Sequence, residues 1–337
     1  MIMRFTALLS LVYASGACAC TIPVFRYALD RWEADKFHLV LPGSATQDAA
    51  LQDALRPLRA NGKANMDITT SRDAALTQAE LRNSRESNQI VWSGTLDQAA
   101  LAALLDSPAR KKIVESILAG DSFIWVIADS GSPLDLAEVE RIEKRLKFLE
   151  QVASLPIQDP NDPDSQLGPG PPLRLKFTTL RLRRDDPAEQ VLLKMLAGPK
   201  GEINPASTSF AAPVFGKGRV LGAWPLAMLD DATLEEASMF LVGRCGCRIK
   251  NENPGWDLLL NVDWEKTLQS VGSTAVPPLN TVSSVPKAAA VPEVVKISAA
   301  EDGKSAQPKS DALFMAAAAL GAVLLGVFLL RAKKAAV

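Results

Sequence analysis

The side chains best suited to chemistry in this 337-residue chain are its four cysteines. They form two Cys-x-Cys pairs, Cys18 with Cys20 near the start of the chain and Cys245 with Cys247 toward its end. Thiolates act as nucleophiles, redox partners and metal ligands. His38 is the single histidine, which excludes a three-histidine metal site. It is expected to be a structural residue, so no His-dependent triad is expected either.

Three kinds of chemistry are open to these cysteines. Disulfide bonding is the default outside the cytoplasm, and four cysteines permit three connectivities. A bridge within either pair closes a small, strained ring, whereas a bridge between the pairs closes a loop of about 225 residues and staples its ends together. The alternatives are a redox role for the thiols and a four-thiolate metal site.

A second group of charged residues follows a predicted strand. Arg181, Arg183 and Arg184 precede Asp185 and Asp186. A basic run that meets an acidic helix cap is typical of a solvated strand end, and the sharper alternative is a site for an anion or a lipid headgroup. The chain contains no phosphate-binding or hydrolase motif of the G-x-x-x-x-G-K-[ST], G-x-G-x-x-G or G-x-S-x-G type, and no cofactor is expected.

The N-terminal residues have the layout of a secretory signal peptide. Arg4 is followed by an apolar run over residues 5–14 and by small residues at 15–17. This order of charge, short apolar run and small residues predicts a signal peptide over residues 1–19. Cleavage after Ala19 would remove Cys18 and leave an odd number of cysteines.

The C-terminal residues predict a membrane anchor. Residues 312–330 contain no charged side chain, and a helix of that length spans about 30 Å, the hydrocarbon thickness of a bilayer. Arg331, Lys333 and Lys334 follow directly, so the tail 331–337 is expected to be cytoplasmic. The bulk of the chain would then lie outside the cytoplasm, in the periplasm, which agrees with the signal peptide.

The elements that must position these residues alternate between strand and helix. A linker over residues 271–311, rich in Pro, Ala, Val and Ser, separates them from the anchor. Apolar periodicity and capping residues predict the body to be of the α/β class. Helices are expected over 21–33, 49–58, 74–81, 96–105, from 107 onward, and over 134–155, 186–197 and 233–242. Strands are expected over 37–41, 65–70, 90–92, 123–128 and 173–182, with a bulge near Thr178, and hairpins over 212–224 and 246–260.

Several segments of this body resemble thioredoxin-like domains. The run Cys20–Leu29 is similar to the start of that family's first helix, with Pro23 in place of the second cysteine. Residues 90–94 followed by a helix resemble its last strand, glycine and helix. The strands at 123–128 and 173–182 and the segment 212–224 resemble a second pass through the same fold. The resemblance implies one or two tandem modules, over residues 20–120 and 121–270.

The departures from the family pattern concern its chemistry. Only Cys20 would stand at a helix N-terminus, where a thiolate is stabilised. The segment between Arg82 and Ile90 contains no proline, and the second module has no cysteine near its first helix. Pro213 is the candidate for the family's cis-proline. The chain also resembles a group of exported bacterial proteins of unknown function, through Cys-Gly-Cys and Asn-Pro-Gly-Trp-Asp near the end of the body.

These observations favour a membrane-anchored extracytoplasmic protein that binds or assists a partner without catalysis of its own. The 37 basic and 38 acidic side chains give a net charge of −1, which argues against a nucleic-acid partner. The expected partners are the membrane, through residues 312–330, and an unidentified protein. The first alternative is a thiol–disulfide oxidoreductase that uses Cys20, with Cys247 as resolving thiol. The second is a metal-handling protein that uses the Cys-x-Cys pairs.

Overall fold

The computed structural model describes residues 21–83, 89–158, 161–245 and 248–275. By internal contacts they belong to one compact unit, Met1–Leu279. The predicted signal peptide, the predicted linker beyond residue 275, the predicted anchor, and Cys18, Cys20 and Cys247 lie outside the described residues. No helix in the described ranges is both long enough and apolar enough to cross a bilayer.

The first sheet has four strands in the order β2-β1-β3-β4. Its strands are β1 (Phe37–Leu41), β2 (Met66–Thr70), β3 (Ala79–Arg82) and β4 (Ile90–Gly94). The parallel pair β1 and β2 is joined by helix α2 (Ala49–Asn61), as a parallel connection requires. Strand β3 runs antiparallel to β1 and to β4. Phe37, Leu39 and Leu41 alternate into the core, which fixes the register of β1.

The second sheet is larger and has the order β10-β8-β7-β5-β6, with β9 paired to β7. The parallel pair β5 and β6 is joined by α5 (Pro133–Val152). Strand β7 runs antiparallel to β5 and to β8. The strands are β5 (Phe123–Asp129), β6 (Phe177–Arg183), β7 (Phe210–Phe215), β8 (Arg219–Val220), β9 (Trp224–Pro225) and β10 (Trp256–Asp257).

The two sheets repeat one arrangement of strands. In each, a parallel β-α-β pair is followed by an antiparallel strand that lies on the other side of the first strand, and then by a further antiparallel strand. The expected α/β class is therefore confirmed. The repeat agrees with two tandem modules of one kind, while their thioredoxin-like character stays a prediction.

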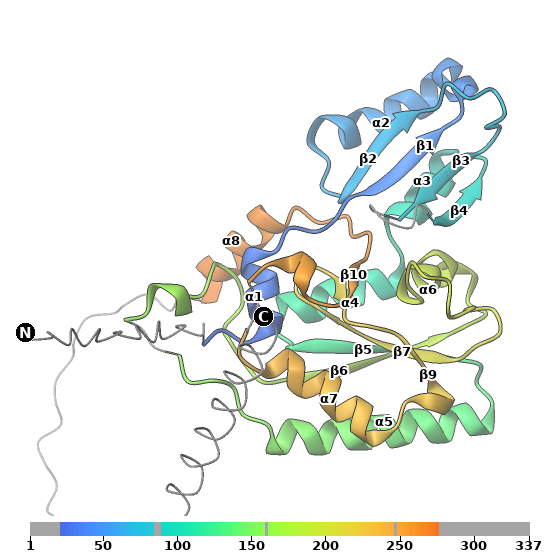
Figure 1. The fold of residues 1–337 in the computed structure, drawn as a ribbon. Coiled ribbons are helices and arrows are strands. Elements are labelled where there is room, and N and C mark those ends of the chain that lie inside the picture. Colours follow the sequence, from blue (N-terminus) through green and yellow to red (C-terminus); the bar gives the residue numbers. More distant parts are fainter. Residues whose placement is uncertain (1–20, 84–88, 159–160, 246–247, 276–337) are drawn as a thin grey trace, which may run out of the picture. The chain divides into compact units, whose positions relative to one another are not determined.

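Helices cover both faces of the second sheet. In Figure 1, α4 (Pro108–Leu118) lies above this sheet, and α5 and α7 (Asp231–Val242) lie below it. The remaining helices are α1 (Val24–Arg31), α3 (Gln98–Leu105), α6 (Gln190–Leu196) and α8 (Trp264–Ala275). Single 3-10 turns occupy Gly43–Gln47, Pro163–Ser165, Pro187–Glu189, Leu226–Met228 and Lys250–Glu252, labelled η1 to η5.

Strand β5 separates two apolar cores because its side chains alternate between the faces of the sheet. Ile124 and Val126 belong to a core shared with the first sheet, α2, α3 and α4. Phe123, Trp125 and Ile127 belong to a second core with α1, α5 and α7. All residues of β5 are buried, as expected of a strand covered on both faces.

A buried polar junction joins α3, α4 and η3. Ser107 caps α4 and donates its hydroxyl to Glu189 Oε2 at 2.6 Å. The Arg110 guanidinium donates to the last carbonyls of α3, those of Leu104 at 2.6 Å and Ala103 at 2.7 Å. Burial lowers the pKa of Arg110 to about 10, although Asp106 and Glu189 act in the opposite direction. The junction satisfies the helix ends where the chain passes from the first sheet to the second.

Helix α1 occupies the part of the sequence for which a helix was predicted. It packs, however, against the second sheet and not against the first, to whose module it was assigned. It precedes β1 in the chain and contacts β7 and α7 of the second sheet, and Val24, Phe25 and Ala28 belong to the second core. The helix that follows the first strand of the first sheet is α2, whose sequence contains no cysteine. Residues 24–31 of the predicted first module therefore pack with the second.

Several predicted elements are wrong, for physical reasons. The last three residues of the predicted helix 74–81 belong instead to β3, because Ala79 and Leu81 are buried with a period of two. The predicted bulge near Thr178 is absent: β6 pairs with β5 in unbroken register. Leu173 and Leu175 pack against one core and Leu180 and Leu182 against the other, which produces the slip in the pattern.

The end of the body also differs from expectation. In place of the hairpin over 246–260, β10 pairs with β8, and the described residues before it hold η5. Helix α7 begins at Asp231 because Asp230 caps it, one turn before the predicted capping box. Helix α8 was not anticipated and continues through residues 271–275 of the predicted linker. The described residues contain no cis peptide bond, so Pro213 is trans.

Candidate functional site

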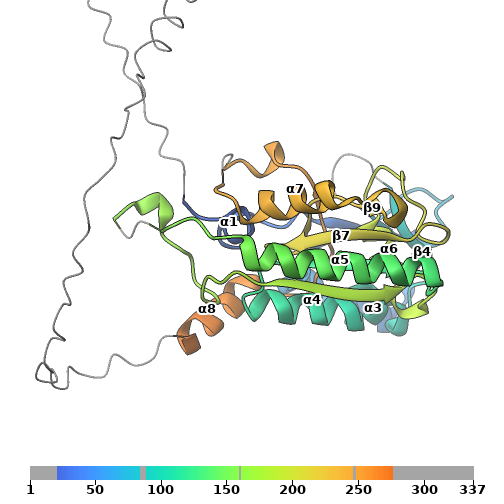
Figure 2. The ribbon, with the colours of Figure 1, turned by 90° about the horizontal axis from the view of Figure 1, so that it is seen from below.

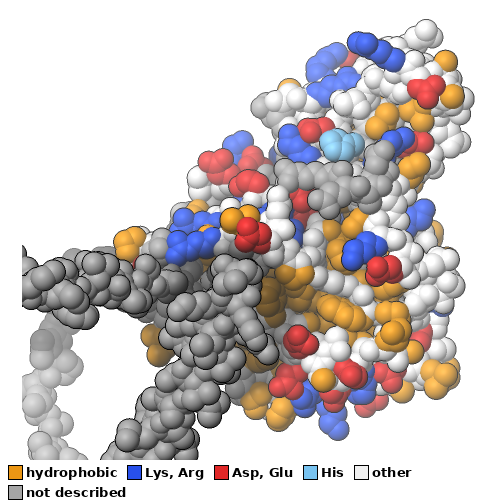
Figure 3. Space-filling view, in the orientation of Figure 1, with side chains coloured by type: hydrophobic (Ala, Val, Ile, Leu, Met, Phe, Trp, Pro, Cys, Tyr) orange, Lys and Arg blue, Asp and Glu red, His pale blue; other side chains and the backbone are white. Residues whose placement is uncertain are grey.

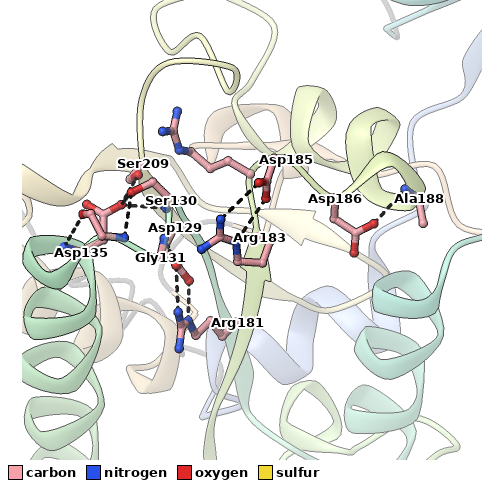
Figure 4. A network of polar contacts seen from close by, with 12 residues as sticks. Asp129, Ser130, Gly131, Asp135, Arg181, Arg183, Asp185, Asp186, Ala188 and Ser209 are labelled. Carbon is pink, nitrogen blue, oxygen red and sulfur yellow. Dashed lines mark hydrogen bonds and ion pairs between the residues drawn. The ribbon is translucent and has the colours of Figure 1, made fainter.

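A network of polar contacts lies at the carboxyl ends of β5 and β6 (Figure 4). Carboxyl ends of parallel strands are the usual place for a ligand site in α/β sheets, because the connecting loops gather there. The loop after β5 leads into α5 and the loop after β6 leads into η3. The predicted basic run falls in this network.

Asp129 ends β5 and forms the closed centre of the network. Its carboxylate is fully buried and accepts two hydrogen bonds from Arg181, Nε to Oδ2 at 2.5 Å and Nη2 to Oδ1 at 2.9 Å. The N–H of Gly131 donates to Oδ1 at 2.7 Å. A paired arginine and a backbone donor compensate the buried charge. Asp129 is therefore committed to holding the loop and is not exposed to a ligand.

Asp135, in the first turn of α5, accepts hydrogen bonds from hydroxyl groups of two separate chain segments. Its Oδ2 accepts from the N–H and the hydroxyl of Ser130, the former at 2.7 Å, and from Ser209 Oγ at 2.6 Å. Ser132 caps α5 by accepting from Asp135 N–H at 3.2 Å. Burial acts to raise the pKa of Asp135, but these side-chain hydrogen bonds, with help from the charge of Arg184, outweigh it and lower the pKa.

Arg183 covers the turn between β5 and α5. It pairs with Asp185 through Nε at 3.1 Å and Nη2 at 3.2 Å. Gly131 beneath it has φ of +76°, and a Cβ there would lie 1.4 Å from Arg183 Nη1. Arg184 donates through Nη1 to the Pro205 carbonyl at 3.4 Å, and its buried Nε has no hydrogen-bond partner among the described residues. Because Arg181 and Arg183 each have a carboxylate, the basic run carries little surplus charge for an anion.

This arrangement is suited to recognition through hydrogen bonds and apolar contact. A carboxylate whose pKa is lowered is a weak base, so Asp135 is poorly placed to activate Ser130 or Ser209 as a nucleophile. Two exposed apolar side chains flank the network: Leu134 in the first turn of α5 is 81% exposed, and Met228 in η4, which packs against α5, is 73% exposed. Exposed apolar side chains at such a position can supply contact area to a protein partner.

The charged surface around the helices has balanced sign. Figure 3 shows acidic and basic side chains intermixed over α5 and α7 on the face drawn. Arg145 of α5 pairs with Glu235 of α7 at 2.5 Å, and Arg141 pairs with Asp231. An open groove of about 760 Å³ lies between α1, the end of α2 and α8 and is lined by acidic and basic residues alike. Neither surface has the single sign that an anionic partner requires.

The predicted cysteine site is described only in part. Cys245 is buried in the second core, while Cys18, Cys20 and Cys247 fall outside the described ranges. Cys245 N–H donates to the Ile22 carbonyl at 3.0 Å, and Pro23 and Arg244 form an antiparallel bridge. Ile22 and Pro23 therefore lie alongside Arg244 and Cys245. Within the described ranges no group of three His, Cys, Asp or Glu residues is placed to hold a metal.

Comparison of the chain with family models, curated proteins and solved structures found no match. The site is therefore interpreted from its own residues. His38 lies in β1 of the first sheet, away from the network, and its structural role stays a prediction. Sequence reasoning identified the arginines but not Asp129, Ser130, Asp135 or Ser209. One available signal was the run Asp-Ser-Gly-Ser-Pro after a buried strand, which combines a turn glycine, a helix cap and a first-turn proline.

Proposed function

We propose that this protein is a membrane-anchored extracytoplasmic binding or accessory protein, and that its binding surface is the loop end of β5 and β6. The observation that supports this most is the combination of a self-satisfied polar network with the exposed side chains of Leu134 and Met228. A rigid network costs little entropy when a partner docks, and apolar side chains beside it supply the affinity. The signal peptide and the anchor at 312–330 are the sequence support for the location.

The alternative function, thiol–disulfide exchange by Cys20, needs a thiolate at a helix N-terminus. Helix α1 begins at Val24 with Pro23 as its cap, and Val24 N–H is already bonded to the Gly243 carbonyl at 3.0 Å. The amide that would stabilise a thiolate most directly is thereby occupied. The contacts of α1 with β7 and α7 favour a structural role for the start of the chain. Any disulfide reductase activity of the purified protein is therefore expected to be unchanged by a Cys20→Ser substitution.

Site-specific photo-crosslinking in cells tests the binding surface. A photoreactive residue in place of Leu134 is expected to yield an adduct with a partner protein. The matched control is the same residue in place of Val152, an apolar side chain at the other end of α5 that is 59% exposed. Equal adducts at both positions would show that the loop end is not the binding surface. Recovery of the full chain in the soluble fraction after cell breakage would refute the membrane anchor.

A further inference from the structure

Strand β6 is the outer strand of the second sheet and has one open edge. The strand order places β5 on one side of β6 and no described strand on the other. In Figure 2 it is the yellow-green arrow that runs between α5 and α4. Open edges present unpaired backbone groups and are the places where sheets of two chains join. Which groups are unpaired here follows from the hydrogen bonds at the two ends of the strand.

The bonds at those ends show which residues of β6 direct their backbone toward β5. The carbonyl of Lys176 accepts from Ser122 N–H at 2.8 Å, and Arg184 N–H donates to the Asp129 carbonyl at 2.9 Å. Backbone groups of successive strand residues point to opposite sides. The even-numbered residues from 176 to 184 therefore bond inward, and the odd-numbered ones direct N–H and C=O to the open edge.

Two of the outward groups are satisfied within the chain. Phe177 N–H donates to Glu150 Oε2 of α5 at 2.6 Å, and the Arg183 carbonyl accepts from Asp186 N–H at 3.2 Å. The other outward groups have no hydrogen-bond partner among the described residues. They are the carbonyl of Phe177, both groups of Thr179, both groups of Arg181 and the N–H of Arg183.

These unpaired N–H and C=O groups lie symmetrically on either side of Leu180, so those of one copy can pair with those of a second, antiparallel copy. We propose that β6 pairs antiparallel with β6 of a second copy of this chain, with Leu180 opposite Leu180. Thr179 then lies opposite Arg181 of the second copy, and each N–H meets the other's carbonyl. The Phe177 carbonyl likewise meets the N–H of Arg183. The one donor and acceptor pair that this register leaves unused, Phe177 N–H and the Arg183 carbonyl, is the pair each copy already satisfies internally.

The side chains fit the same register. Charges on an edge strand normally prevent such pairing, but Arg181 would face Thr179 and Arg183 would face Phe177, so no like charges stand directly opposite. Arg181 is in addition neutralised by Asp129. On the other face, a groove of about 460 Å³ between α4 and residues 178–180 leaves room for the side chains of an added strand. The resulting interface is isologous, as in most homodimers.

Cysteine cross-linking of the full chain in detergent tests the register. Opposed residues at a non-hydrogen-bonded position have Cα atoms about 4.5 Å apart, within disulfide range. Leu180→Cys is therefore expected to give a disulfide dimer in which residue 180 is linked to residue 180. Thr178→Cys is the matched control, because Thr178 would face Leu182, and it should cross-link no more than the unsubstituted chain. Equal cross-linking by both variants would refute the pairing.

A proline substitution tests the edge itself. Thr179→Pro removes only an outward N–H and leaves the bonds to β5 intact, as proline on an edge strand does. The mass of the protein in detergent is expected to fall from two chains to one, with the unfolding midpoint unchanged. Leu180→Pro, which removes an inward bond, should lower that midpoint instead. If the unsubstituted chain is monomeric, or if Thr179→Pro stays dimeric, the proposed interface is wrong.

Discussion

At the residue scale, Asp135 is the carboxylate whose ionisation most directly shapes the candidate site. Its pKa is lowered in the folded protein because hydroxyl donors outweigh the effect of burial. A depressed folded-state pKa contributes stability that is present above the unfolded value, about 3.9, and is lost as the pH falls through the folded value. At neutral pH the charged form therefore holds Ser130 and Ser209 in place.

Asp135→Asn is expected to lower the stability at pH 7 and to matter progressively less as the pH falls below about 4. The reason is that the carboxylate of the unsubstituted protein then becomes protonated and loses the same interaction. Urea unfolding followed by circular dichroism at several pH values measures the difference between the two proteins. A difference that stays constant from pH 7 to pH 3 would contradict the assignment of the shift to these hydrogen bonds.

At the scale of elements, a buried ion pair attaches the Pro- and Gly-rich segment before β6 to helix α1. Arg26 and Asp30 pair at 2.9 Å with side chains that are 3% and 0% exposed. Arg26 also donates to the Gly168 carbonyl at 2.7 Å and to that of Pro171, and Asp30 accepts from Gly168 N–H at 2.8 Å. The attachment of this segment depends on these two side chains.

Arg26→Ala is expected to destabilise the protein by about 3–5 kcal/mol, because it leaves the Asp30 carboxylate buried without its partner. The control is Arg56→Ala, which removes an arginine from the exposed pair with Asp53, 77% and 66% exposed. Its cost should not exceed about 1 kcal/mol. Denaturant unfolding of the two variants measures both losses of stability. Similar losses would show that the buried pair of Arg26 and Asp30 contributes little.

The sequence predicted most elements whose signal is local and missed features that depend on long-range packing. The strand at 123–128 and the helix that begins after residue 107 were predicted because neighbouring residues determine them. The helix predicted over 74–81 is wrong because β3 is only four residues long, too short for its apolar pattern to distinguish a strand from a helix. Pairing of β3 with β1 determines that the segment is a strand. The site at Asp129 and Asp135 was missed because one of its hydrogen-bond donors, Ser209, lies just before β7 and is 74 positions away from Asp135 in the sequence.

At the scale of the whole molecule, the ends of the folded body are joined by backbone pairing. The bond from Cys245 N–H to the Ile22 carbonyl and the bridge between Pro23 and Arg244 connect residues more than two hundred positions apart. This pairing gives a physical basis to the prediction that a disulfide links the N-terminal Cys-x-Cys pair to the C-terminal one. The buried position of Cys245 in the second core is consistent with a structural role.

We therefore expect the oxidised protein to contain at least one disulfide between the pair Cys18 and Cys20 and the pair Cys245 and Cys247. Closing so long a loop restricts the unfolded chain and stabilises the folded state by roughly 5 kcal/mol in the chain-entropy model. Peptide mapping without reduction identifies the bridge, and reduction should lower the unfolding midpoint. Three or more free thiols in the denatured, unreduced protein would contradict the staple. Because α1 and Cys245 both belong to the second core, loss of the bridge should first loosen the contacts of α1 with β7 and α7.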